Sequence, residues 1–109
     1  MRETMPGELR LSFQSDLNIR NIDQISKEMT TALDASSRLT LELKEDAVVD
    51  LSFVQLLIAA RRQANRAGGA LSLARPAGAN LLGVLSRGGF LKEASAEDLE
   101  FWLHQENSQ

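Results

Sequence analysis

A serine two residues after an aspartate is the pair in this chain best placed for chemistry. Asp50 and Ser52 open an apolar run that ends in two arginines, Arg61 and Arg62, so the serine stands at the start of a helix. Backbone N–H groups in a helix's first turn lack intrahelical acceptors and favour negative charge. A phosphate on the Ser52 hydroxyl would be tolerated there while changing the surface that a partner meets. The same hydroxyl without phosphate can simply cap the helix.

The chain offers little for catalysis. His104 is its only histidine, so a histidine-based nucleophile, acid–base pair or metal site would depend on one residue near the C-terminal end. There is no Gly-x-Ser-x-Gly turn, no phosphate loop and no Gly-x-Gly-x-x-Gly fingerprint. We therefore predict that the protein is not an enzyme, and we expect no catalytic residue, metal or cofactor.

Length and composition indicate one globular domain. The chain has 109 residues, of which 43% are hydrophobic and 25% charged, which is ordinary for a single core. Its longest apolar run is much shorter than the roughly 20 residues that span a bilayer. With no cysteine and no apolar centre of a secretory signal among its first residues, a cytoplasmic protein is expected.

The distribution of charge favours protein partners over nucleic acid. The formal net charge is −3, whereas nucleic-acid binders gather Lys and Arg to match phosphates. Residues 50–92 carry six basic and one acidic side chain, and residues 93–109 carry five acidic and no basic ones. A basic centre beside an acidic tail suits an acidic protein partner or a nucleotide, although the same charges could only solvate the surface.

Alternating polar and apolar residues predict three strands, and helical spacing predicts the helices between them. The strands are expected at 8–13, 38–43 and 70–74, and the helices at 22–35, from Ser52 to the glycines at 68–69, at 80–86, and after Ser95. This order predicts an α/β domain over residues 8–104, with a small mixed sheet, helices mainly on one face, and flexible ends at 1–7 and 105–109. The other sheet face would be left for a partner or a second copy of the chain.

The start of the second helix carries two further predictions. Ser52 is predicted to be the solvent-accessible N-cap, because Gln55 lies three residues later and would complete a capping pair. Phe53 is predicted to be at least partly exposed, because it precedes the main apolar stripe of the helix.

The segment from Asp50 to Arg62, which reads DLSFVQLLIAARR, resembles the corresponding segment of the STAS family (sulfate transporter and anti-sigma factor antagonist domains). Leu17-Asn18-Ile19, residues 68–73 and residues 89–91 look like further landmarks, so the resemblance covers nearly the whole chain. It implies a compact α/β domain that binds a protein, typically an anti-sigma-type serine kinase. It also implies release of that partner when a serine at the position of Ser52 is phosphorylated. Leu51 and Phe53 depart from the family's small residues and weigh against phosphorylation by the usual kinase class.

Our leading interpretation is a non-catalytic interaction module of a bacterial regulatory pathway, similar to an anti-sigma factor antagonist, with Ser52 as its candidate phosphoacceptor. The alternative is an accessory subunit or scaffold of a lipid-transport-like or chemosensory complex, without phosphorylation. A nucleotide-binding or small hydrolytic enzyme is the least favoured interpretation, and a homodimer is left open. The partner-binding residues are predicted to be Asp50, Leu51, Ser52, Phe53 and Gln55.

Overall fold

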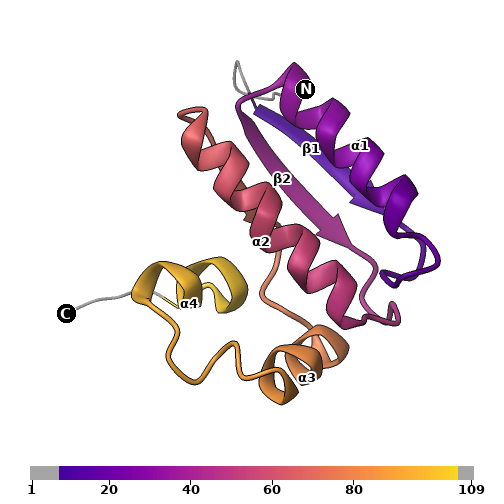
Figure 1. Ribbon diagram of the computed structural model, residues 1–109, viewed down its shortest axis with the longest axis vertical. Helices are drawn as coiled ribbons and strands as arrows, with labels where there is room; N and C mark the ends of the chain where they lie inside the picture. Colours follow the sequence, from indigo (N-terminus) through magenta and orange to yellow (C-terminus); the bar gives the residue numbers. More distant parts are fainter. Residues whose placement is uncertain (1–7, 106–109) are drawn as a thin grey trace.

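The order of elements follows the predicted alternation of strand and helix (Figure 1). The computed structural model describes residues 8–105, so the predicted flexible ends at 1–7 and 105–109 lie outside it except for residue 105. Its elements are β1 (Glu8–Phe13), α1 (Ile22–Ala35), β2 (Arg38–Leu43), α2 (Leu51–Arg66), β3 (Ala70–Leu73), α3 (Ala79–Arg87) and α4 (Ala96–Leu103). Every predicted strand and helix is present, and the predicted ends lie within about two residues of the observed ones.

The three described strands form one sheet in the order β1-β2-β3, and both pairings are parallel. The α/β class is confirmed, but within residues 8–105 the sheet is parallel rather than mixed. The reason is connectivity. A helix follows β1 and another follows β2, and each helix returns the chain to the end of the sheet at which the strands begin, so the next strand runs in the same direction.

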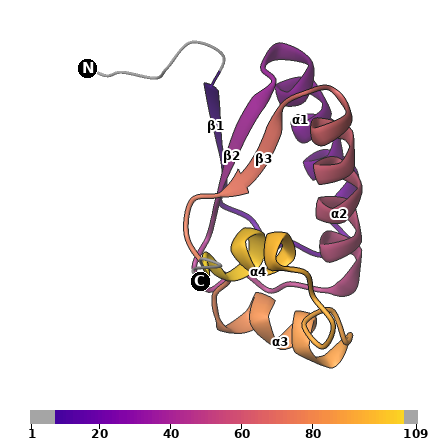
Figure 2. The same cartoon turned by 90° about the vertical axis from the view of Figure 1, so that its left-hand side faces the viewer.

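Helices α1 and α2 cover one face of the sheet, as Figure 2 shows in side view, whereas α3 and α4 lie beyond its end. Leucines of the central and third strands point toward these helices and are buried: Leu39, Leu41, Leu71 and Leu73. They pack with Phe53 and Leu57 of α2 and Met29 of α1 in one core cluster. Burial of this apolar stripe is the main force that holds the two layers together.

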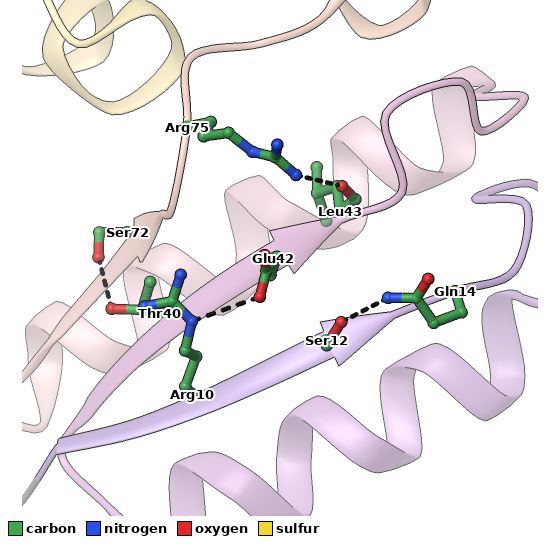
Figure 3. Close-up of polar contacts among 8 residues, drawn as sticks. All are labelled: Arg10, Ser12, Gln14, Thr40, Glu42, Leu43, Ser72 and Arg75. Atoms are coloured by element: carbon green, nitrogen blue, oxygen red, sulfur yellow. Dashed lines mark hydrogen bonds and ion pairs between the residues drawn. The ribbon is translucent and has the colours of Figure 1, made fainter. Parts of the chain in front are cut away.

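The opposite face of the sheet carries polar side chains (Figure 3). Arg10 Nε lies 3.4 Å from Glu42 Oε1, and the hydroxyls of Thr40 and Ser72 are 3.2 Å apart. Parallel sheets are usually buried on both faces. Here the second face satisfies its polar groups across neighbouring strands instead, so the predicted incomplete coverage of the sheet is confirmed for the described part of the chain.

Glycine pairs end two helices, and the pair at 68–69 does so as predicted. Gly68 has φ +81° after α2, and Gly89 has φ +79° after α3, a region that side chains disfavour. The N–H of Gly68 donates to Asn65 O at 3.1 Å, and the N–H of Gly69 to Ala64 O at 2.9 Å. These are the two hydrogen bonds of a Schellman motif, which satisfies the last carbonyls of α2.

Helix α4 is anchored on α2 through Arg61. The Arg61 guanidinium lies 2.8 Å from the Asp98 carboxylate and 4.7 Å from the centre of the Phe101 ring. Ser95 and Asp98 form the capping box that the sequence predicts at the start of α4. Trp102 is buried beside Phe101, with the two rings edge to face at 4.8 Å. The C-terminal helix is thereby part of the core.

Candidate interaction site at the start of α2

Two loops run side by side at the carboxyl end of the sheet, one after β1 and one after β2. The N–H of Leu17 donates to Val48 O at 2.7 Å, and the N–H of Asp50 donates to Leu17 O at 3.2 Å. Leu17 and Val49 form an isolated parallel bridge, and Asp16 Oδ1 accepts the N–H of Val48 at 3.0 Å. The loops therefore extend the parallel pairing beyond the named strands and hold residues 16–19 against the start of α2.

Asp50 is the N-cap of α2, which corrects the prediction that Ser52 has this role. Its backbone is extended, and its Oδ1 accepts the N–H of Ser52 at 3.1 Å and the Ser52 hydroxyl at 2.5 Å. Ser52 is instead the second residue of the helix and is half-buried. Because its hydroxyl turns back to the carboxylate of Asp50, the predicted capping pair with Gln55 is not the arrangement that starts the helix.

The second oxygen of the Asp50 carboxylate reaches the other loop. Oδ2 accepts the backbone N–H of Ile19 at 2.9 Å. Burial raises the pKa of the Asp50 carboxyl, but hydrogen bonds from the Ser52 hydroxyl, from Ile19 N–H and from N–H groups of the first helical turn outweigh this effect. The pKa therefore lies below the ordinary value of 3.8, and Asp50 is a charged acceptor at neutral pH.

Exposed apolar residues lie on both of the segments that this carboxylate joins. Ile19, Val48 and Leu51 are 65%, 54% and 46% exposed, and they are the three most exposed large apolar side chains of residues 8–105. Ile19 comes from the first loop, and Val48 and Leu51 come from the second loop and the start of α2, which the hydrogen bonds above hold side by side. Gln55, one turn further along α2, is also exposed. We call Ile19, Val48, Asp50, Leu51, Ser52 and Gln55 the helix-start surface.

Phe53 does not belong to this surface, and the prediction that its ring is partly exposed is wrong. Its side chain is 0% exposed, in the middle of the core. An α-helix turns by about 100° per residue, so residues two apart point in nearly opposite directions. Because Leu51 faces outward, Phe53 faces the sheet, and it cannot contact a partner directly.

Ile19 and Val48 are surface residues that were not predicted from the sequence. Leu17-Asn18-Ile19 served only as a landmark of the family resemblance, and Val48 was part of a short apolar run. In that run the neighbours Ala47 and Val49 are buried or half-buried while Val48 points out. The alternation was a signal for Val48, but no local pattern places Ile19 beside a residue 31 positions later.

Arg61 and His104 both have hydrogen-bond partners within the described residues. Arg61 is paired with Asp98 at 2.8 Å, so it is not a free clamp for a phosphate. His104 ends α4, where its Nε2 lies 2.9 Å from the carbonyl oxygen of Leu73. Within residues 8–105 no group of three or more metal-type ligands occurs, and no helix there is long and apolar enough to cross a membrane.

The family described as "Mlab, STAS domain" matches the chain over residues 1–92. Searches of curated proteins and of solved structures gave no match. The matched stretch includes all three strands, helices α1 to α3 and the whole helix-start surface. It thus covers most of the 109 residues, and the parallel sheet with its helical layer agrees with it. The chain belongs to the STAS domain family.

Proposed function

We propose that this STAS domain is a protein-interaction module of a bacterial regulatory pathway, similar to an anti-sigma factor antagonist, and that it binds its partner through the helix-start surface. STAS domains are generally interaction modules rather than enzymes. The proposal is carried by the position of Ile19, Val48 and Leu51, the most exposed large apolar residues of the described chain, on two segments that hydrogen bonds hold together at the start of α2. Apolar side chains gathered on a surface and rimmed by polar groups mark binding sites.

The polar groups of the surface suit recognition. The Asp50 carboxylate is held by hydrogen bonds from both loops, so its position is fixed before a partner arrives. A preorganised site loses less conformational entropy on binding than a mobile one. Apolar anchors around a fixed polar centre would give a partner both binding energy and a defined orientation.

Phosphorylation of Ser52 is the finer part of the proposal. The hydroxyl lies in the first turn of α2, where the helix dipole favours negative charge. Phe53 points into the core, so its ring does not crowd the hydroxyl from the surface side. Leu51 is then the bulky neighbour that a kinase has to accommodate.

A second candidate function is an accessory subunit or scaffold of a transport or chemosensory complex, using the same surface without phosphorylation. Two observations favour it. The matching family is described as "Mlab, STAS domain", and the Ser52 hydroxyl is half-buried and already bonded to Asp50. The two functions differ in the partner and in whether Ser52 is modified.

Calorimetry of the purified chain against the products of neighbouring genes tests the proposal. We expect Ile19→Lys and Leu51→Lys to weaken binding by at least about tenfold, because each removes an apolar anchor and adds a charge that must be desolvated. Leu82→Lys on α3 is the matched control, since Leu82 is also exposed, at 38%, and lies outside the helix-start surface. Equal affinity of all three variants and the wild type would show that the helix-start surface is not the binding site for the partner. A serine kinase as the binding partner favours the first function, and a transport or receptor component favours the second.

A further inference from the structure

We propose that the Asp50 carboxylate couples the chemical state of Ser52 to the position of Ile19, so that negative charge on Ser52 alters the shape of the helix-start surface as well as its charge. The inference rests on the proposed function only in that both residues belong to the same contact surface. It concerns the free protein and can be tested without a partner.

One planar carboxylate serves two segments that are far apart in sequence. Oδ1 accepts the N–H of Ser52 at 3.1 Å and its hydroxyl at 2.5 Å, while Oδ2 accepts the N–H of Ile19 at 2.9 Å. The two oxygens are rigidly connected, so any rotation of the carboxylate that relieves a contact on the Ser52 side also moves the acceptor of Ile19.

Ile19 depends on this hydrogen bond more than a core residue would. Its side chain is 65% exposed, so packing contributes little to its position. Its neighbour Leu17 is fixed by the backbone bonds to the second loop, and Arg20 N–H donates to Asn18 Oδ1 at 3.2 Å. The Asp50 contact is what ties Ile19 itself to α2.

Phosphorylation would remove one side of this arrangement. Transfer of a phosphoryl group from a nucleoside triphosphate forms a bond between Ser52 Oγ and the γ-phosphorus. It breaks the bond from that phosphorus to the bridging oxygen, releases the nucleoside diphosphate, and sends the hydroxyl proton to solvent. Ser52 Oγ then has no proton to donate to Asp50, and a dianion stands beside the carboxylate.

The phosphate and the carboxylate would also compete for the same donors. The N–H of Ser52, which donates to Asp50 Oδ1, is one of the first-turn groups that a phosphate at this position would use. Repulsion between like charges and loss of the hydroxyl donor both favour rotation of Asp50 away from its present position. Ile19 then loses its acceptor, and the most exposed apolar residue of the surface is released from α2.

Amide hydrogen exchange followed by NMR in the free chain tests this coupling. We expect Ser52→Asp, and the chain carrying phosphoserine at position 52, to speed exchange of the Ile19 amide by about tenfold, the factor for loss of one ordinary hydrogen bond. Ser52→Ala should speed it less than Ser52→Asp does, because it removes the hydroxyl donor but adds no repulsion and leaves Asp50 its backbone donors. Gln55→Asp is the matched control, since it adds the same charge one turn away without displacing the Asp50 contacts.

The Leu41 amide of β2 reports global stability in the same spectra. Faster exchange at Ile19 with an unchanged rate at Leu41 supports the coupling. An unchanged Ile19 rate in Ser52→Asp, or equal acceleration at Ile19 and Leu41, would overturn it. If Ile19 responds but no variant of the helix-start surface affects partner binding, the coupling stands and the proposed function fails. If variants of the helix-start surface weaken partner binding but the Ile19 rate does not respond to Ser52→Asp, the surface is a binding site and the coupling fails.

Discussion

Leu51 and Phe53 lie two residues apart in the first turn of α2 and have opposite environments. Leu51 is 46% exposed, whereas Phe53 is 0% exposed and packs in the core. One turn of helix thus carries both an anchor for a partner and an anchor for the fold, and substitutions at the two positions should separate binding from stability.

We expect Phe53→Ala to lower the free energy of unfolding by about 3–5 kcal/mol, because it removes a fully buried ring and leaves a cavity. Leu51→Ala should change it by no more than about 0.5 kcal/mol, as for other exposed positions, while weakening partner binding. Urea denaturation of both variants measures the difference. Similar losses of stability would mean that Leu51 is part of the core after all.

The stability of the domain should fall in acid because of two aspartates. Hydrogen bonds to Asp50 outweigh its burial, and the Arg61 guanidinium beside Asp98 is the main cause for that carboxyl; both pKa values lie below 3.8. A lowered pKa in the folded state stabilises the protein above the unfolded value, and this stabilisation is lost as the pH falls through the folded value.

Thermal denaturation between about pH 5 and pH 2 measures this loss. Asp50→Asn and Asp98→Asn should each make the decline shallower below pH 4, because each removes one group that takes up a proton on unfolding. Asp46→Asn is the control, since its side chain is 84% exposed. If the pH profile is unchanged in both Asp50→Asn and Asp98→Asn, these two carboxyls are not the cause of the loss of stability in acid.

Gly69 should tolerate no side chain. A Cβ at this position would lie 1.7 Å from the carbonyl oxygen of Ser37, which is backbone and cannot move aside. We expect Gly69→Ala to cost well above the roughly 1 kcal/mol of an average substitution. Gly78→Ser is the control: its Cβ would lie 3.5 Å from Glu45 O, and serine is a good N-cap for α3. That variant should be as stable as the wild type or slightly more stable by urea denaturation.

Arg61 should govern the docking of α4. Its side chain is 20% exposed, bonds to Asp98 and lies over the Phe101 ring. Arg61→Ala should cost about 1–2 kcal/mol, and the neighbouring exposed Arg62→Ala much less. Trp102 is the only tryptophan of the chain, so its fluorescence reports α4 directly. We expect its emission to shift at a lower urea concentration in Arg61→Ala than in Arg62→Ala. If the two variants unfold at the same urea concentration, Arg61 does not govern the docking of α4.

Ser52→Asp should weaken partner binding, whereas Ser52→Ala should leave it nearly intact. A new carboxylate in the contact surface has to be desolvated beside Asp50, and Arg61 is occupied by Asp98 and cannot pair with it. Removal of the hydroxyl costs only one hydrogen bond, about 1 kcal/mol of stability. Calorimetry with the identified partner measures the affinity of each variant. Equal affinity of both variants would show that Ser52 lies outside the surface that contacts the partner.

The sequence alone determined the elements, because their signals are local. Alternation in residues 8–13 and 38–43 marks β1 and β2 to the residue, and the apolar spacing after Asn21 gives a helix ending at Ala35. The capping box at Ser95 and the glycines after α2 and α3 are also local patterns. The family resemblance was visible in the same way, since it depends on contiguous motifs.

Tertiary structure decided how the helix-start surface is built. Asp50 and Ser52 are both good N-caps by residue type, so sequence spacing could favour either one. The choice falls on Asp50 because a second donor, the N–H of Ile19, meets its carboxylate from a loop 31 residues earlier. That contact exists only after β1 and β2 pair in parallel and bring their following loops together. The same pairing orients α2 so that Phe53 is buried and Leu51 is exposed. The helical period only requires that the two side chains point in opposite directions, and it does not determine which of them faces the sheet.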